Sequence, residues 1–214
     1  MRIGVFGTGM VGETIATKLV ALGHEVTMGA RSAQNEKAAA WVARTGARAS
    51  QGSFADAASF GAVLFNCTKG EVSLDVLASA GVERLGSKVL VDVANPLDFS
   101  RGKPPTLSIG NDDSLGESIQ RAFPALKVVK TLNTVNCEVM VEPGRVKGDH
   151  TMFLCGNDDG AKEVVTDILR SMGWRDIIDL GDIAAARATE ALMPIWLRLW
   201  GKLKTSDFNL KVVR

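Results

Sequence analysis

The sequence predicts an α/β fold: a doubly wound, mostly parallel sheet covered by helices on both faces. Short apolar runs rich in Val, Ile and Phe recur along the 214 residues, which is typical of strands buried on both faces. Segments with helical periodicity separate most of these runs. A glycine-rich turn joins the first run to the first helical segment, so the alternation of strand and helix that defines this fold class begins at once.

The expected strands are, in chain order, "RIGVF", "HEVTM", "GAVLFNC", "KVLVDVA", "KVVKTL", "TMFLCG" and "WRDIIDL". The expected helices cover residues 10–22, 34–45, 71–80, 114–122, 158–172 and 182–203. Capping residues support the fifth of these helices. Asp158 and its neighbours can cap its first turn, and Gly173 is placed to end it.

Two stretches rich in Pro, Gly and polar residues interrupt the pattern, at residues 95–114 and 142–150. Neither stretch is long enough to be a free linker. We therefore expect a main domain over residues 1–142 and a small C-terminal α/β extension over residues 143–214 that packs on the same sheet.

The charge balance argues against several classes of partner. The chain has 25 Lys and Arg against 24 Asp and Glu, so it lacks the strong field that attracts nucleic acid or an anionic membrane surface. No apolar run approaches the roughly 20 residues of a membrane span, and the first residues lead directly into a strand, without room for a signal peptide. We expect a cytoplasmic protein with no nucleic-acid or membrane partner.

The three cysteines, Cys67, Cys137 and Cys155, lie far apart and have no neighbouring His. This spacing indicates neither a metal site nor a disulfide framework, and buried free thiols are the simplest interpretation. The chain also contains no Tyr, so it cannot contain the Tyr-x-x-x-Lys proton relay of short-chain dehydrogenases.

The glycine-rich turn, "GTGMVG" at residues 7–12, matches the G-x-G-x-x-G pattern of Rossmann-type dinucleotide-binding folds. Gly7 permits the tight turn, Gly9 lets the backbone approach a pyrophosphate, and Gly12 lets the helix pack closely on the strand. The N-terminus of the helix offers N–H groups and the positive end of its dipole to the phosphates. The main domain is therefore expected to bind a dinucleotide.

The end of the second expected strand indicates which dinucleotide binds. An NAD site places an Asp or Glu there to accept hydrogen bonds from the ribose 2′-hydroxyl, but "HEVTMGARS" ends without an acid. Arg31 instead offers a planar cation to a 2′-phosphate, Ser32 offers a hydroxyl, and Lys37 adds a positive charge. This pattern predicts NADP, and a solvated loop with incidental charges is the alternative.

Six stretches spread over nearly the whole chain resemble one known family. They are "GTGMVG", "GARS", "VDVANPL", "KTLNTVNCEVMVEP", "MFLCGNDDGAK" and "ARATEALMPIWLRL". The family is that of the coenzyme F420 (deazaflavin) dependent NADP oxidoreductases, which is also similar to the cytosolic domain of six-transmembrane ferric reductases. The resemblance implies NADP(H) as cofactor and a deazaflavin as co-substrate.

The resemblance also implies roles for individual residues. Those implied at the cofactor phosphates are Thr8, Gly9, Met10 and Val11 at the pyrophosphate and Arg31, Ser32 and Lys37 at the 2′-phosphate. Asn133, Thr134 and Val135 correspond to the segment beside the nicotinamide and deazaflavin rings. Asn133 and Thr134 are therefore the candidate catalytic residues.

Ligands of open α/β sheets bind at the carboxyl ends of the strands. Thr68 and Lys69 follow one expected strand, and Ala94 and Asn95 follow the next. These four residues are further candidates for cofactor contacts. Lys69 can equally be a solvated surface residue, and Asn95 with Pro96 can equally form a structural turn.

Hydride transfer between a nicotinamide and a flavin-like ring needs two stacked rings, and the cofactors supply the electronics. A protein acid or base is not essential, which suits a chain with only two histidines, His24 and His150, both expected to be structural. We therefore expect an NADP(H)-dependent oxidoreductase that acts between NADPH and a small-molecule acceptor, a flavin or deazaflavin. The alternatives are an NADPH reductase of imines or hydroxyacids and an NADP-sensing protein without catalysis.

The last expected helix has a broad apolar face. Its residues are Leu192, Ile195, Trp196, Leu199 and Trp200. Core packing is the default interpretation, but two tryptophans four residues apart also suit a dimer interface or an aromatic wall for an acceptor ring. We expect a homodimer that uses part of residues 183–200, and we expect Pro194 to bend this helix.

Overall fold

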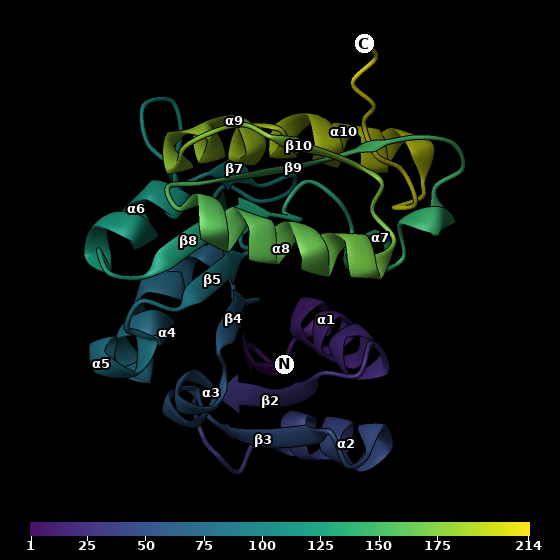
Figure 1. The fold of residues 1–214 in the computed structure, drawn as a ribbon. Helices are drawn as coiled ribbons and strands as arrows, with labels where there is room; N and C mark the ends of the chain where they lie inside the picture. The colour runs from purple at the N-terminus through teal and green to yellow at the C-terminus, as the bar shows by residue number, and fades with distance from the viewer.

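The computed structural model describes all residues from 1 to 214. Its centre is an eight-stranded sheet with the strand order β10-β9-β8-β5-β4-β1-β2-β3 (Figure 1). The strands of this sheet are β1 (Arg2–Phe6), β2 (Glu25–Ala30), β3 (Ala49–Ser53), β4 (Val63–Asn66), β5 (Val89–Asp92), β8 (Lys127–Thr131), β9 (Thr151–Gly156) and β10 (Asp176–Asp179). Two short strands, β6 (Leu97–Asp98) and β7 (Thr106–Leu107), form a separate antiparallel hairpin.

Every pair of neighbouring strands in the sheet is parallel except β8 and β9. The expected doubly wound, mostly parallel α/β fold is therefore confirmed. The antiparallel pair is where the chain after residue 142 joins the sheet, so β9 and β10 continue the sheet formed by the preceding strands. The expected domain boundary at residue 142 stays a prediction.

Helices cover both faces of the sheet. The helices are α1 (Met10–Ala21), α2 (Glu36–Thr45), α3 (Phe54–Phe60), α4 (Ser73–Ala80), α5 (Val82–Leu85), α6 (Leu115–Ala122), α7 (Cys137–Val141), α8 (Asp159–Met172), α9 (Ala186–Ala191) and α10 (Met193–Leu203), with short 3₁₀ turns η1 (Gly70–Val72), η2 (Pro143–Arg145) and η3 (Ile183–Ala185). None of them combines the length and apolar composition that a bilayer crossing requires, and the longest, α8, has 14 residues.

The hydrophobic core consists of two clusters, one on each face of the sheet. One cluster contains residues of α1, α2, α7 and α8, and the other contains residues of α3, α4, α5, α6 and α9. Successive side chains of a strand point to opposite faces, so β4 contributes Val63 and Phe65 to the first cluster and Leu64 to the second. Burial on both faces explains why most of the central strand runs are predominantly apolar.

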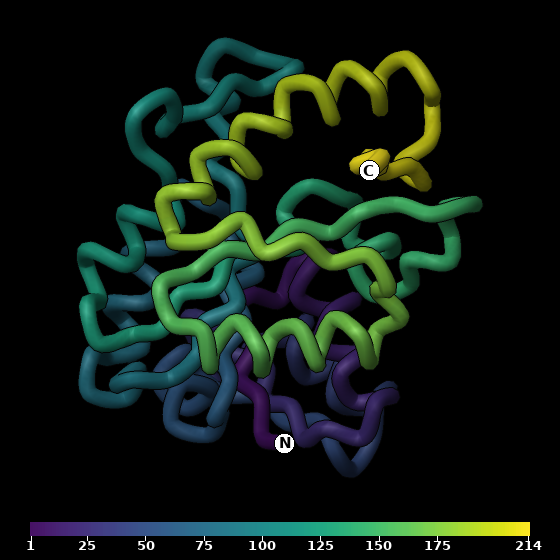
Figure 2. The backbone as a smooth tube through the Cα atoms, turned by 45° about the horizontal axis from the view of Figure 1, so that its top comes forward, coloured from purple at the N-terminus to yellow at the C-terminus, as the bar shows by residue number.

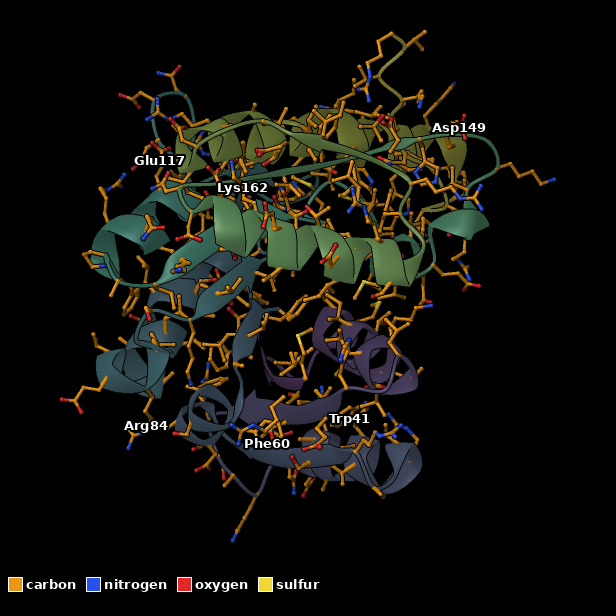
Figure 3. The ribbon with its side chains drawn as sticks, viewed as in Figure 1. Trp41, Phe60, Arg84, Glu117, Asp149 and Lys162 are labelled. Atoms are coloured by element: carbon orange, nitrogen blue, oxygen red, sulfur yellow. The ribbon has the colours of Figure 1, made fainter.

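Trp41 is the largest fully buried side chain of the first cluster. It lies on α2, close to α1 and the sheet (Figure 3), and its indole N–H donates a hydrogen bond to Thr17 Oγ1 of α1 at 3.0 Å. This contact joins the second half of α1 to α2.

Several elements differ from those expected. The structure adds β3 and α3 between residues 49 and 60, the hairpin of β6 and β7, and the short helices α5 and α7. The helical stretch expected over residues 182–203 is divided into η3, α9 and α10. Pro194 lies in the first turn of α10, where the missing N–H of proline ends the hydrogen-bond ladder of the preceding helix.

Candidate active site

The glycine turn joins the end of β1 to the start of α1 and leaves one side of its backbone open. The Gly7 N–H donates to the carbonyl oxygen of Gly29 at 3.0 Å, which fixes the turn beside the end of β2. A Cβ at Gly12 would lie 2.1 Å from the Gly7 carbonyl oxygen, so no larger residue fits there. A Cβ at Gly9 would meet no atom within 4 Å. The open space above Gly9 therefore fits a ligand group that approaches the backbone, as a pyrophosphate does.

The first turn of α1 is suited to bind an anion. No side chain caps this helix, so its first N–H groups have no partner within it and carry the positive end of the helix dipole. The acid of this turn, Glu13, is paired with Arg44, whose Nη2 lies 2.6 Å from its carboxylate. The predicted contacts Thr8, Met10 and Val11 lie in the same segment, and Met10 is 72% exposed. This segment fits the phosphates of a dinucleotide.

Arg31, Ser32 and Lys37 lie between the end of β2 and the first turn of α2, close to the glycine turn. All three are exposed, and neither Arg31 nor Lys37 takes part in an ion pair. Ser32 Oγ accepts a hydrogen bond from the Gln34 N–H at 3.2 Å. Two unpaired cations and a hydroxyl, with no acid at the end of β2, fit a 2′-phosphate.

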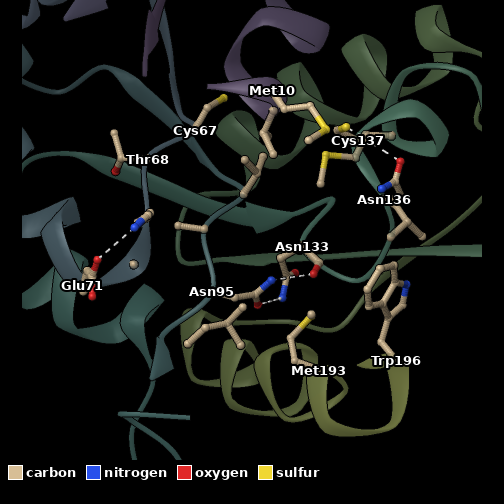
Figure 4. Close-up of a pocket in the computed structure, with 18 of the residues that line it drawn as sticks. Met10, Cys67, Thr68, Glu71, Asn95, Asn133, Asn136, Cys137, Met193 and Trp196 are labelled. Carbon is tan, nitrogen blue, oxygen red and sulfur yellow. Dashed lines mark hydrogen bonds and ion pairs between the residues drawn. The ribbon is translucent and has the colours of Figure 1, made fainter. Parts of the chain in front are cut away.

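A cavity of about 390 Å³ opens beside the glycine turn, at the carboxyl ends of β4, β5 and β8 (Figure 4). The predicted residues that line it are Met10, Val11, Thr68, Lys69, Ala94, Asn95, Asn133 and Val135. Met10 and Val11 belong to both the turn and the cavity wall, so the two sites are continuous. Thr134 does not line this cavity. It is buried and lines a smaller cavity next to α10.

Asn95 and Asn133 bind each other in the wall of the cavity (Figure 4). Asn95 Nδ2 donates to the Asn133 carbonyl oxygen at 2.8 Å, and Asn133 Nδ2 donates to Asn95 Oδ1 at 2.9 Å. Leu132, the preceding residue, has a φ angle of 62°, a conformation that a non-glycine residue keeps only where the surrounding structure holds it. The amide pair thus fixes the loops after β5 and β8 relative to each other.

A buried ion-pair network lies behind these two loops. Lys130 Nζ is 2.8 Å from Asp92 Oδ2 and 2.8 Å from Glu190 Oε1, and it also donates to the Ala94 carbonyl oxygen. Burial disfavours the charged amine, but the two carboxylates outweigh burial and hold the pKa of Lys130 above its ordinary value. By binding Ala94, Lys130 holds the backbone that carries Asn95.

This network is not among the features predicted from the sequence. The sequence feature that could have indicated the network is Lys130, in the middle of the apolar stretch "KVVKTL", because a charge in a buried strand requires a partner. The identity of the partners depends on the strand order and on the docking of α9, which no local pattern contains.

Thr68 and Lys69 follow β4 but have different surroundings. Thr68 Oγ1 donates to Asn66 Oδ1 at 2.6 Å, so a buried amide of β4 orients this hydroxyl. The Lys69 side chain is 79% exposed, and its Nζ is 3.5 Å from Glu71 Oε1 (Figure 4). The positive charge of Lys69 is therefore partly offset at the rim of the cavity.

The thiols near the site are not reactive nucleophiles. Cys67 and Cys137 line the cavity and are buried, and burial raises the pKa of both thiols. A protonated thiol is a poor nucleophile. The histidines lie elsewhere: His24 Nδ1 is 3.2 Å from the amino-terminal nitrogen, and His150 Nε2 is 3.0 Å from the Pro143 carbonyl oxygen.

The residues that close the cavity away from the glycine turn are also not among those predicted from the sequence. Leu97 and Phe99 come from the hairpin segment, and Met193 and Trp196 come from α10 (Figure 4). Trp196 therefore lies where an aromatic wall would be, which is one of the roles considered above for the tryptophans of the last expected helix. Trp200 does not line the cavity and is half-exposed.

The glycine turn, the unpaired cations and the adjoining cavity have the geometry of a dinucleotide-binding site of the Rossmann type. A family model described as NADP oxidoreductase coenzyme F420-dependent matches residues 2–96. A solved structure from Arthrobacter sp. FB24, provisionally assigned as an F420-dependent NADP-reductase, is 50% identical and has a TM-score of 0.95, with 100% of both chains covered. The chain belongs to the coenzyme F420-dependent NADP oxidoreductase family, which confirms the resemblance found in the sequence.

Two curated relatives are longer than the region of similarity. The F420-dependent NADP reductase of Methanocaldococcus jannaschii is 30% identical over 131 residues, which are 61% of this chain and 58% of that protein. Metalloreductase STEAP3 of Rattus norvegicus is 30% identical over 199 residues, which are 91% of this chain and 38% of that protein. This chain therefore spans less than two thirds of either relative.

Proposed function

We propose that the protein is an NADP(H)-dependent oxidoreductase that transfers a hydride between NADPH and a flavin or deazaflavin. The observation that carries this proposal is the continuity between the glycine turn and the cavity at the strand ends, which share Met10 and Val11. The turn suits a pyrophosphate, and the cavity lies where an open α/β sheet binds its ligand. The name of the Methanocaldococcus jannaschii relative supports a deazaflavin as the acceptor.

Residues of three segments would hold the cofactor. Residues 7–12 would bind the pyrophosphate, and Arg31, Ser32 and Lys37 would bind the 2′-phosphate. The candidates for the remaining contacts are Thr68, Lys69, Ala94, Asn95 and Val135. Bound NADPH would supply the hydride, so the protein needs no redox group of its own.

The chain itself contributes positioning and exclusion of water. Asn133 and Asn95 fix the two loops that border the cavity, and Asn133 is the candidate that would orient the reacting rings. Thr134, the second residue predicted to be catalytic, does not line the cavity and would be a positioning residue that supports the same loop. The mostly apolar lining excludes water from the reacting atoms.

The ionisable groups of the cavity favour transfer between two rings. They are Lys69 and Glu71, which pair with each other at the rim, and two thiols whose pKa values burial raises. Reduction of an imine or a carbonyl needs a proton donor at the reacting atom. Ring-to-ring hydride transfer depends on alignment instead, so this lining supports a flavin-like acceptor over the small-molecule alternatives.

We further propose that the protein is a homodimer that uses α10. Ile195, Trp200 and Leu203 are each about half-exposed on this helix, at 51%, 50% and 51%. Ile195 and Leu203 lie two helical turns apart and so share one face of α10. Large apolar side chains grouped in this way are typical of the core of an interface between two copies of a chain.

Transfer of deuterium tests the proposed reaction. NADPH labelled with deuterium at C4 of the nicotinamide is incubated with the protein and, in separate reactions, riboflavin, FMN or 5-deazariboflavin. We expect deuterium on the reduced deazaflavin, which retains it at carbon, whereas a reduced flavin exchanges it from nitrogen. NADPH binding is measured separately by calorimetry. Intact binding without reduction of any acceptor would contradict the proposal and leave two alternatives, an NADP-sensing protein and an NADPH reductase of imines or hydroxyacids.

A further inference from the structure

The segment after α10, residues 205–214, turns back from the end of that helix toward β9 (Figure 2). We call this segment the C-terminal strap. It has no regular secondary structure, yet it is attached to the sheet by backbone hydrogen bonds. The Thr151 N–H donates to the Leu210 carbonyl oxygen at 2.9 Å, and the Val212 N–H donates to Thr151 Oγ1 at 3.1 Å.

Side chains of the strap reinforce this attachment. Asn209 Nδ2 donates to the Thr151 carbonyl oxygen at 2.9 Å and lies 3.0 Å from His150 Nδ1. Asp207 is paired with Arg145 at 3.1 Å. With contacts to η2, to the loop before β9 and to β9 itself, the strap has a defined position.

The strap supports one wall of the cavity from outside. The Phe208 ring is stacked on the indole of Trp196, with ring centroids 5.3 Å apart and an interplanar angle of 27°. Trp196 lines the cavity, and Phe208 does not. Phe208 therefore does not reach the cavity directly and supports it from behind Trp196.

A second observation joins the strap to the loop that follows β8. Thr134, Trp196, Phe208 and Asn209 all line one small cavity of about 10 Å³ between α10 and the strap. Thr134 Oγ1 and Trp196 Nε1 are buried there without a partner in the protein. The strap thus packs against the two segments that border the larger cavity, the Asn133-Thr134 loop and α10.

We propose that the strap is a positioning device for the acceptor, in which Phe208 holds the Trp196 indole as the acceptor-side wall. This inference rests on the proposed function, because it assigns a role at the same cavity. Phe208 is a positioning residue that acts through Trp196. The glycine turn and Arg31 lie at the cofactor end of the site, so a change at Phe208 affects the acceptor and leaves NADPH binding intact.

The test compares three variants with the wild-type chain. Phe208→Ala removes the stacked ring, Phe208→Tyr keeps it, and Lys211→Ala changes a strap residue that pairs with Asp176 and does not line either cavity. We expect Phe208→Ala to raise the KM for 5-deazariboflavin about tenfold, with the Kd for NADPH within about twofold of wild type. Phe208→Tyr and Lys211→Ala should retain the wild-type KM.

An unchanged KM in Phe208→Ala, or an equal loss of NADPH and acceptor binding, would overturn the proposal. If the wild-type chain reduces no acceptor, the proposed function fails separately, and binding of 5-deazariboflavin measured by quenching of tryptophan fluorescence decides the role of the strap. Weaker binding by Phe208→Ala then supports the role, whereas equal binding or no binding to either protein refutes it. Phe208→Leu, which keeps most of the volume without a ring, gives the same comparison if Phe208→Ala does not fold.

Discussion

Arg31 provides the sharpest test of cofactor choice, because its side chain is exposed and takes part in no ion pair. Arg31→Ala should therefore change the free energy of unfolding by no more than about 0.5 kcal/mol. A hydrogen bond to a charged group contributes about 1.5–3 kcal/mol. The exposed position and the remaining charge of Lys37 favour the low end of this range, about 1.5–2 kcal/mol. The Kd for NADPH should then rise about 10-fold to 30-fold.

The assay measures the Kd of NADPH and of NADH by calorimetry, for the wild-type chain and for Arg31→Ala. The ratio of the two changes isolates the contact between Arg31 and the 2′-phosphate, because effects common to both cofactors cancel. The contact is expected to weaken as salt is added, since ions screen exposed charges.

Arg48→Ala is the matched control. Arg48 is also exposed and precedes β3 at the opposite, amino-terminal edge of the parallel strands, so its loss changes the net charge equally but should leave both Kd values unchanged. An equal loss of NADPH and NADH binding in Arg31→Ala would refute the assignment of Arg31 to the 2′-phosphate.

Three further predictions concern the turn, the amide pair and the proposed dimer, and a fourth concerns acid stability. Gly9→Ala should fold with nearly wild-type thermal stability yet bind NADPH at least about tenfold more weakly, whereas Gly12→Ala should lower the melting temperature. Normal NADPH binding by Gly9→Ala would contradict the inference that the open space above Gly9 holds the pyrophosphate. Asn133→Leu should lower kcat far more than it weakens NADPH binding, and steady-state kinetics that show the reverse would remove its positioning role. Light scattering should give about twice the chain mass, and Leu203→Glu should give a monomer, while a wild-type monomer would end the dimer proposal. A hydrogen bond from Thr151, and after it the nearby Lys211 ammonium, lowers the pKa of Asp176 from its ordinary value of 3.8. The ionised carboxylate therefore stabilises the folded chain above that ordinary value, and this stabilisation is lost as the pH falls through the lowered pKa. The difference in unfolding free energy between wild type and Asp176→Asn should shrink over that acid range.

The sequence predicts those parts of the molecule that depend on local chemistry. The turn at residues 7–12 and the cations after β2 follow from residue types at fixed spacing, because a tight turn and an anion site each need particular neighbours. β3 escaped prediction because "ASQGS" contains no β-branched or aromatic residue, and its pairing with β2 at the edge of the sheet overrides its weak propensity.

Contacts between distant segments mark the limit of sequence reasoning. The sequence places Asn95 and Asn133 after expected strands, but their reciprocal hydrogen bonds depend on the strand order and on the side-chain positions in the folded sheet. The proposed role of Phe208 is still harder to predict from the sequence, because the strap has no hydrophobic periodicity and the role depends on where α10 places Trp196.

The buried lysine described behind the site has a consequence for how the chain reaches its native state. Lys130 is neutralised by Asp92 and by Glu190, and Glu190 also accepts hydrogen bonds from the first N–H groups of α6. Loss of Glu190 would leave Lys130 with Asp92 as its only carboxylate partner and would leave the first N–H groups of α6 without their acceptor, and both changes are unfavourable in a buried site. Detachment of α9 alone would therefore expose the sheet to this cost, so α9 and the central strands should melt together in a single cooperative transition. During synthesis, the ion-pair network behind the cavity cannot be complete until residue 190 has left the ribosome, so this part of the molecule should be among the last to form.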